Sequence, residues 1–350
     1  MKGGSAFPVA ADPYEMSAHK KIQSWQGSAL RIGGSVLALI LLFHFLPLGD
    51  VWTAFRKLPA HVWLLVLAGY LAAHVVGISK WRLMVNVSGA GLNFRQAVRC
   101  YFSGLFSTLF LPSIIGGDVV RASLALRFGK SNAGVLLGSF LDRILDFVAL
   151  GLLAAAGLTL APGALAPQTR NVFVIVGIVV GVLLAVSAPI VLWFPARKVS
   201  FRIRRRLARL RGAARSIHNE KGYVVVALSL GLIVQGSFIW LMAQVADASG
   251  LHLPFRAWLF AWPLAKLSAV IPITQGGIGI REAALAALLI PFGARAAVTV
   301  AVGLAWETVI ITGGLIAGLT AFLLDHFSVA GAIPAATSEA KSETSSLPRR

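Results

Sequence analysis

Two short segments of this sequence carry proline, paired glycines and arginine at identical spacing. In each, proline is followed after three residues by Gly-Gly, and after three more by arginine: Pro112, Gly116, Gly117 and Arg121 in the first, and Pro272, Gly276, Gly277 and Arg281 in the second. Proline ends a helix and glycine permits turns that side chains obstruct, so each segment predicts a helix break followed by a new helix N-terminus. The free N–H groups of such a terminus, with arginine about one turn later, suit an anion such as a phosphate.

Acidic side chains in apolar segments form a second group of candidates. Five of the 13 acidic residues fall in or beside apolar runs, namely Asp118, Asp142, Asp146, Glu282 and Glu307. Charges inside a membrane are costly, so we expect them to face the protein interior with a partner. Arg143 precedes Asp146 by three residues and can pair with it, either in a site or as a purely structural ion pair. Glu307 has no adjacent cation, so it meets Lys266, meets an arginine of one break, or titrates.

Composition shows that the solvent of this chain is the lipid bilayer. Hydrophobic residues make up 57% of the 350 residues and charged residues only 13%, with a mean hydropathy of +0.80, which no soluble domain of this length can bury. The net charge of +19 arises from Lys and Arg in short loops between apolar runs, so it reports topology and predicts no nucleic-acid partner. The single cysteine, Cys100, excludes an intrachain disulfide and has no metal-ligand neighbours. We expect no enzyme activity, cofactor or metal.

The apolar runs predict an all-α polytopic membrane protein. Six uninterrupted runs are long enough to cross a bilayer as helices, at residues 32–48, 61–78, 135–160, 172–194, 223–246 and 297–324. Two further runs, at residues 97–115 and 257–272, end at the Pro-Gly-Gly breaks and then resume. The predicted membrane domain spans residues 30–326, between a polar cytoplasmic tail at 1–29 and a disordered tail at 327–350.

The distribution of basic residues predicts that the first break is re-entrant. Residues 197–221 contain ten basic residues and one acid, and residues 80–99 contain four basic residues and no acid, so both segments should be cytoplasmic. If residues 97–115 crossed the membrane fully, the ten-charge loop would lie outside. A hairpin that enters and leaves on one side over residues 97–127 places both basic segments inside, and with them both termini.

The two breaks also predict an inverted repeat. Three full spans separate them, and an odd number means that the second copy enters from the opposite side, as in many secondary transporters. We expect the two copies to form two halves of one anion-facing site, with the intramembrane charges as an ion-pair network. The candidate substrate-binding residues are Pro112, Gly116, Gly117, Asp118, Arg121, Asp142, Arg143, Asp146, Pro272, Gln275, Gly276, Gly277, Gly279, Arg281, Glu282 and Glu307. The alternative is that Gly-Gly only permits close helix packing while the arginines extend to the interface.

Three blocks of the sequence resemble the flippase-like membrane domain of lysylphosphatidylglycerol synthases. They comprise residues 111–121, the Asp-Arg-Ile-Leu-Asp block at residues 142–146, and residues 276–282. The resemblance covers about residues 30 to 325. The family commonly has Glu where this chain has Asp142. The resemblance is to the membrane domain of the full synthases, and we expect a short polar tail after it where those proteins have an aminoacyl-transferase domain.

The resemblance implies lipid translocation or lipid handling and does not imply lysine transfer. Members of the family are associated with aminoacyl-phospholipids, hopanoids and polyprenyl-linked sugars. We therefore expect a bacterial inner-membrane protein that moves a lipid with an anionic head group. Its expected partners are membrane lipids and, in addition, either further copies of the same chain or a lipid-synthesis enzyme. Two alternatives remain open: an ion-coupled carrier of a small soluble anion, and a membrane protein that recruits an enzyme without transporting.

Overall fold

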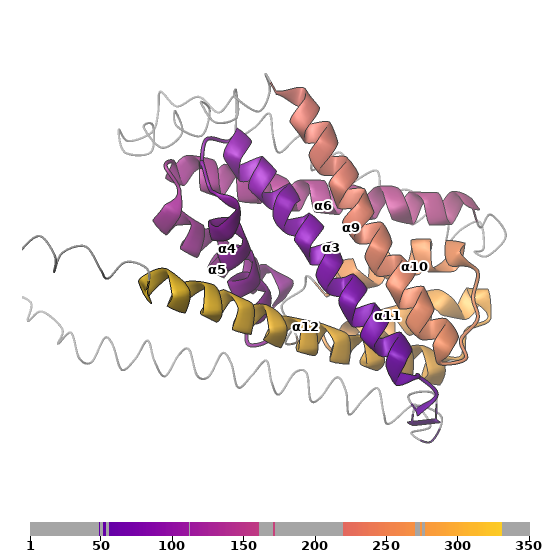
Figure 1. Cartoon of the computed structure of the whole chain (residues 1–350). Coiled ribbons are helices and arrows are strands. Elements are labelled where there is room, and N and C mark those ends of the chain that lie inside the picture. The colour runs from indigo at the N-terminus through magenta and orange to yellow at the C-terminus, as the bar shows by residue number, and fades with distance from the viewer. Residues whose placement is uncertain are drawn as a thin grey trace, which may run out of the picture.

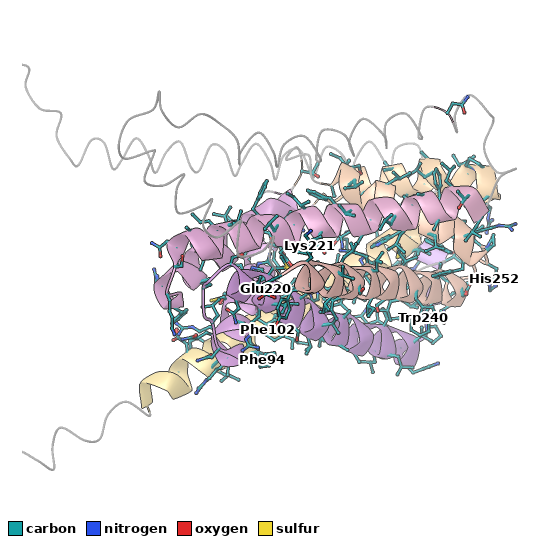
Figure 2. All side chains as sticks on the ribbon, turned by 90° about the horizontal axis from the view of Figure 1, so that it is seen from above. Phe94, Phe102, Glu220, Lys221, Trp240 and His252 are labelled. Carbon is teal, nitrogen blue, oxygen red and sulfur yellow. The ribbon has the colours of Figure 1, made fainter. Side chains whose placement is uncertain are left out.

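The computed structural model describes residues 49, 52–53, 56–111, 113–160, 171, 220–269, 274 and 277–330, and most of these residues are helical. These residues form eight α-helices and one short 3-10 helix (Figure 1). The predicted all-α polytopic membrane fold is confirmed. Apolar side chains such as Trp240 stand outward from the bundle, more than half exposed, as expected of a surface that faces lipid (Figure 2).

Within the described residues, four helices are long and apolar enough to cross a membrane. They are α3 (Ala60–Val87), α6 (Asn132–Leu160), α9 (Lys221–Ala248) and α12 (Ala296–Ala330). Each contains one of the predicted spans, and α12 continues past the predicted end of its span at residue 324. The predicted spans at residues 32–48 and 172–194, the first 29 residues, and the tail from residue 331 onward lie outside the described residues.

Two pairs of short helices occur where the sequence predicts breaks. The first pair is α4 (Phe94–Ser107) and α5 (Ser113–Phe128), and the second is α10 (Phe255–Ser268) and α11 (Ile280–Leu289), which is followed by the 3-10 helix η2 (Ile290–Phe292). A helix of 14 residues is about 21 Å long, which is less than the roughly 30 Å of a bilayer core. None of the four helices can therefore cross a membrane alone.

Each short pair begins and ends at one end of the bundle. Lys130, just after α5, donates its backbone N–H to the carbonyl of Ala90, just before α4, at 2.8 Å. In the second pair, the ring of Phe260 in α10 lies 6.2 Å from that of Phe292 in η2. The members of each pair pack on each other, so each pair is a helical hairpin.

The first Gly-Gly does not form the break, contrary to the sequence expectation. Gly116 and Gly117 lie inside α5, which begins at Ser113, so the break falls earlier, after Ser107. The glycines serve the close packing of the hairpin: a Cβ on Gly117 would meet the carbonyl oxygen of Gly104 at 2.5 Å. Arg121 consequently lies in the third turn of α5, away from its N-terminus. The close-packing alternative therefore holds for the glycines of this copy, but Arg121 is buried and does not extend to the interface.

The second copy matches the expectation more closely. Gly277 and Gly279 have positive φ values of 83° and 87°, which residues with a side chain rarely adopt, and α11 begins immediately afterwards at Ile280. Arg281 and Glu282 thus lie in the first turn of a new helix. Pro112, Pro272, Gln275 and Gly276 lie outside the described residues.

The eight helices form two repeats of opposite direction. A long helix, a hairpin and a second long helix occur first as α3 to α6 and again as α9 to α12. Helices α3 and α9 run side by side and antiparallel (Figure 1): Asn86 near the end of α3 lines one hollow with Tyr223 near the start of α9, and Lys57 before α3 lies beside Gly250 after α9.

The remaining helices follow the same inverted relation. Helix α6 runs antiparallel to α3, because Gly134 near its start lies against Ser88 at the end of α3. Helix α12 runs parallel to α3, since the Trp63 indole N–H donates to the hydroxyl of Thr308 at 2.8 Å and Gly313 packs on Tyr70. The first helix of each hairpin packs on the last helix of the other repeat, α4 on α12 and α10 on α6. The described helices therefore have the arrangement that an inverted repeat predicts.

Candidate functional site

A charged cavity of about 120 Å³ lies inside the bundle, where both repeats meet. Its lining comes from α3, α4, α5 and α6 of the first repeat and from α9 and α10 of the second. Seven charged side chains line it, namely Lys80, Asp118, Arg121, Asp142, Arg143, Asp146 and Lys266. Such a density of charge inside an apolar helix bundle is costly, which makes the cavity the candidate functional site.

Six of these side chains form a closed ring of alternating charge. Around the ring, each neighbouring pair is an ion pair: Lys80–Asp142 at 3.0 Å, Asp142–Arg121 at 3.3 Å, Arg121–Asp118 at 3.0 Å, Asp118–Arg143, Arg143–Asp146 at 3.9 Å and Asp146–Lys80 at 2.6 Å. Every member therefore has two partners of opposite sign. The ring joins α3, α5 and α6, and its net charge is zero.

Local structure explains how these side chains come together. Asp142 and Asp146 lie four residues apart on one face of α6, so both reach Lys80 on the adjacent α3. Asp118 and Arg121 lie three residues apart on α5, and the glycine contact with α4 brings this helix deep into the bundle. The Arg121 guanidinium lies 5.0 Å from the ring centroids of both Trp81 and Tyr101, a cation–π arrangement that further fixes it.

Lys266 is the seventh charge of the cavity and stands outside the ring. Its ammonium donates to the Gln235 side-chain oxygen at 2.8 Å and lies 4.8 Å from the centroid of Phe238. The Gln235 amide in turn donates to Asp146 at 3.4 Å. Among the described residues, no carboxylate lies within 4.0 Å of the Lys266 ammonium, so the cavity has one positive charge in excess.

Several nitrogen atoms that line the cavity have no hydrogen-bond partner among the described residues. They are Nε2 of His74, Nε of Arg121 and Nε of Arg143. His74 and Arg121 are only 8% and 6% exposed, so neither side chain is freely solvated. The Nδ1 atom of His74 lies 3.2 Å from the Tyr101 hydroxyl, which fixes the ring. The three residues line the cavity, so its wall keeps hydrogen-bonding capacity that no described residue uses.

A second buried charge cluster lies in the second repeat. Arg281 pairs with Glu282 at 2.8 Å and with Glu307 of α12 at 2.5 Å. The second oxygen of Glu282 accepts the backbone N–H of Gly279 at 2.6 Å, which caps the start of α11. All three charged side chains are buried, at 4%, 0% and 8% exposure respectively. The prediction that Glu307 meets an arginine of one break is therefore confirmed, and Lys266 is not its partner.

Aromatic rings separate the two clusters. Tyr70 lies edge-on to His74 at 4.5 Å and to Trp306 at 5.9 Å, and Trp306 lies 5.4 Å from Trp262. The Arg281 guanidinium stands 5.6 Å from the Trp262 ring on the far side. The described residues therefore do not bring both arginines into the central cavity: Arg121 lines it, whereas Arg281 is paired with two carboxylates beside Trp262.

The candidate residues therefore divide between these two places. Gly117, Asp118, Arg121, Asp142, Arg143 and Asp146 line the cavity; Gly279, Arg281, Glu282 and Glu307 belong to the second cluster; and Gly116 and Gly277 serve backbone packing. The sequence prediction missed Lys80, Lys266, His74 and Gln235 as cavity residues. The criterion that identified the acids also applies to the two lysines, because each is a charge within an apolar segment and needs a partner.

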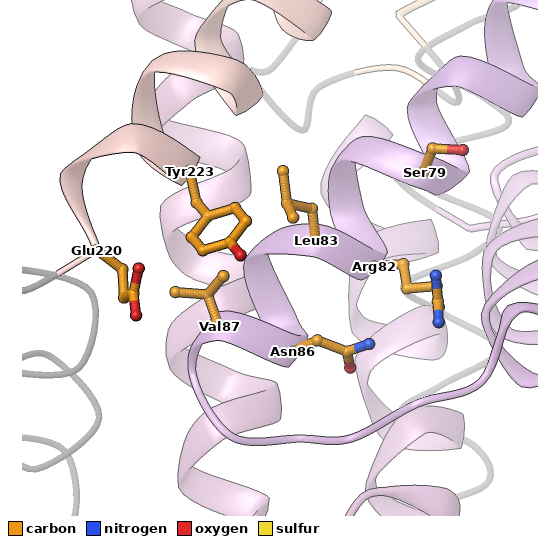
Figure 3. A pocket seen from close by; sticks show the side chains of 7 residues that line it. All are labelled: Ser79, Arg82, Leu83, Asn86, Val87, Glu220 and Tyr223. Carbon is orange, nitrogen blue, oxygen red and sulfur yellow. The ribbon is translucent and has the colours of Figure 1, made fainter.

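A wider and more open hollow lies outside the bundle, between the end of α3 and the start of α9. It has a volume of about 620 Å³, and Figure 3 shows Arg82 and Glu220 on its two sides with Tyr223 and Leu83 between them. The Arg82 side chain donates to the carbonyl of Leu92 at 3.0 Å and so holds the connection to α4. This hollow therefore differs from the central cavity in its openness and in having few charged groups.

An all-helical membrane protein with inverted repeats and a buried, charged cavity has the general organisation of a secondary transporter. The sequence model of the lysylphosphatidylglycerol synthase TM region matches residues 28–318. The chain belongs to this family, which relates it to lipid handling. No curated protein sequence matches it.

Proposed function

We propose that this protein translocates a lipid across the membrane and that the anionic, phosphate-bearing head group of the lipid occupies the central cavity. The observation that supports this most directly is the cavity itself, which lies inside an apolar bundle, has one positive charge in excess and is lined by two arginines whose Nε–H groups have no partner among the described residues. Donors fixed in this way bind a phosphate oxygen well because little has to reorganise. The family relationship supports a lipid as the bearer of that phosphate.

The proposal includes a placement in the membrane. We propose that the two hairpins are re-entrant, that the chain lies in a bacterial inner membrane, and that both termini are cytoplasmic. The basic residues Arg82, Arg95, Arg99, Arg127 and Lys130 lie around the ends of α3 and α5 and the start of α4, which supports a cytoplasmic location for that end of the bundle. The alkyl chains of the lipid would remain in the bilayer beside the bundle.

A soluble anion is the second candidate substrate, and the size of the cavity favours it. A volume of about 120 Å³ accommodates a small anion or only the phosphate of a lipid, and not a whole lipid. In either case the protein moves its ligand without chemical change, because the ring carboxylates and cations are engaged with one another. The two candidates differ in whether a soluble glycerophosphodiester crosses the membrane as well.

Lipid translocation can be tested by filling the cavity. In liposomes with fluorescent phosphatidylglycerol, the purified protein should expose inner-leaflet label to a membrane-impermeant quencher. Leu105→Trp places a large ring into the cavity, and we expect it to slow this exposure about tenfold or more, a barrier change of ~1.4 kcal/mol. Leu83→Trp, in the open hollow, is the matched control and should retain the wild-type rate.

The same liposomes distinguish the two candidate substrates. If wild type and Leu105→Trp both expose the label no faster than protein-free liposomes, lipid translocation is excluded. Release of a trapped, radiolabelled glycerophosphodiester by wild type, blocked in Leu105→Trp, would then support the soluble anion.

A further inference from the structure

The charge balance of the cavity singles out one residue. The three cations and three carboxylates of the ring neutralise one another through six ion pairs, so none of them is in surplus. Lys266 alone adds a charge that no carboxylate of the described residues contacts. Of the second repeat's described residues, it is also the only charged one that lines the cavity.

The neighbours of Lys266 leave its ammonium able to bind an anion. An ammonium has three N–H donors, and Gln235 accepts one of them. The face of Phe238 stabilises a cation without accepting a conventional hydrogen bond. Arg121 and Arg143 line the same cavity, and the Nε–H group of each has no hydrogen-bond partner among the described residues, so the wall around Lys266 holds further donors.

We propose that Lys266 holds the anionic group of the substrate and that the site selects a group with a single negative charge, such as a phosphodiester, over a doubly charged phosphomonoester. This inference deepens the proposed function and rests on it only for the lipid as the source of the phosphate. A singly charged oxyanion makes the cavity neutral. A doubly charged one leaves a net negative charge in a site of low dielectric, which is strongly unfavourable.

The ring also has a defined part in this selection. Because it is neutral, it contributes hydrogen-bond donors without attracting a second negative charge. Removing one ring carboxylate should therefore raise the net charge of the cavity and change the preferred ligand. Asp146 suits this purpose. It is linked to Lys266 through Gln235, and it is the more distant of the two carboxylates that pair with Arg143.

The test measures binding to the full chain in lipid nanodiscs at a pH of about 7, where a phosphomonoester carries roughly 1.5 to 2 negative charges. Three probes are used: dihexanoyl phosphatidylglycerol, dihexanoyl phosphatidic acid and soluble glycerophosphoglycerol. We expect wild type to prefer the phosphodiester lipid over the phosphomonoester lipid. Lys266→Met should weaken phosphodiester binding about tenfold or more, which is ~1.4 kcal/mol, and Lys266→Arg should restore most of it.

Two further variants distinguish a ligand from a structural role. Asp146→Asn should shift the preference toward the phosphomonoester lipid, an effect that a general loss of packing does not produce. Lys130→Met changes an exposed lysine outside the cavity and should leave all three affinities unchanged. Unaltered phosphodiester binding in Lys266→Met, or an unaltered preference in Asp146→Asn, would overturn the proposal.

The soluble probe separates this inference from the proposed function. If glycerophosphoglycerol binds as tightly as the lipid and its binding requires Lys266, the lysine assignment stands and the lipid assignment fails. If the lipids bind equally well to wild type and Lys266→Met, the lipid assignment stands and the lysine assignment fails. If wild type binds none of the three probes, both are overturned.

Discussion

Buried charges in this protein are distributed in two different ways. The ring in the first repeat gives every charged group two opposite partners beside a cavity, whereas Arg281 alone balances Glu282 and Glu307 in a closed environment. A buried ion pair contributes little net stability compared with apolar packing, but removing one partner is costly because the other charge remains buried. We therefore interpret the second cluster as a structural connection between α11 and α12. The ring, by contrast, forms part of the cavity wall.

This distinction predicts a large stability effect at Arg281. Arg281→Met leaves two buried carboxylates without a cation, and we expect a loss of roughly 3–5 kcal/mol in the free energy of unfolding. Thermal unfolding of the detergent-solubilised protein measures it. Arg256→Met removes an exposed arginine near the start of α10 and serves as the control. Equal unfolding temperatures for the two variants would show that the Arg281 pairs are not formed.

At the level of elements, the first hairpin depends on a contact between two glycines. Gly104 of α4 and Gly117 of α5 allow the helix backbones to touch, and Arg121 lies one turn after Gly117. The contact thus sets the depth at which the Arg121 guanidinium enters the ring. Glycine costs helix propensity at both positions, and close packing between helices explains why it is nevertheless present.

A methyl group at this contact should separate the hairpin. In Gly104→Ala the new Cβ would lie 2.7 Å from the Gly117 carbonyl oxygen and 2.9 Å from the Arg121 Cβ, so backbone must move. We expect a loss of about 1–3 kcal/mol in stability, together with slower lipid exposure in the liposome assay. In Gly151→Ala nothing lies within 4 Å of the new Cβ, and stability should be unchanged or slightly higher. A neutral Gly104→Ala would contradict the close contact.

For the whole molecule, the two repeats predict which ends of the hairpins share a side of the membrane. Arg95 and Lys130 flank the first hairpin, and His252 and Arg295 flank the second. All four are exposed, and the structure places each pair at one end of the bundle. With the proposed orientation, we expect the first pair on the cytoplasmic side and the second on the opposite side.

Single cysteines at these positions test the arrangement. In a Cys100→Ala background, Arg95→Cys and Lys130→Cys should react with a membrane-impermeant maleimide only when the cytoplasmic side is accessible. His252→Cys and Arg295→Cys should react from the other side. If Arg95→Cys and Lys130→Cys react from opposite sides, the first hairpin crosses the membrane and the re-entrant arrangement is excluded.

The sequence alone determined the features that depend on composition and local pattern. Apolar runs of sufficient length located the four described spanning helices, because only a helix satisfies its backbone hydrogen bonds in lipid. The duplicated Pro-Gly-Gly-Arg pattern located both hairpins and their inverted relation, and isolated charges in apolar runs identified most of the cavity lining.

The tertiary structure decided which charges meet. Sequence proximity suggested Arg143 with Asp146, yet the ring is completed by Lys80 and Asp118 from other helices, and Arg121 and Arg281 lie in separate clusters. Helix rotation and the depth of each hairpin set these partners, and both follow from packing over the whole bundle. The surplus charge of Lys266 emerges only after every other charge in the cavity has been assigned its partner, which sequence spacing cannot do.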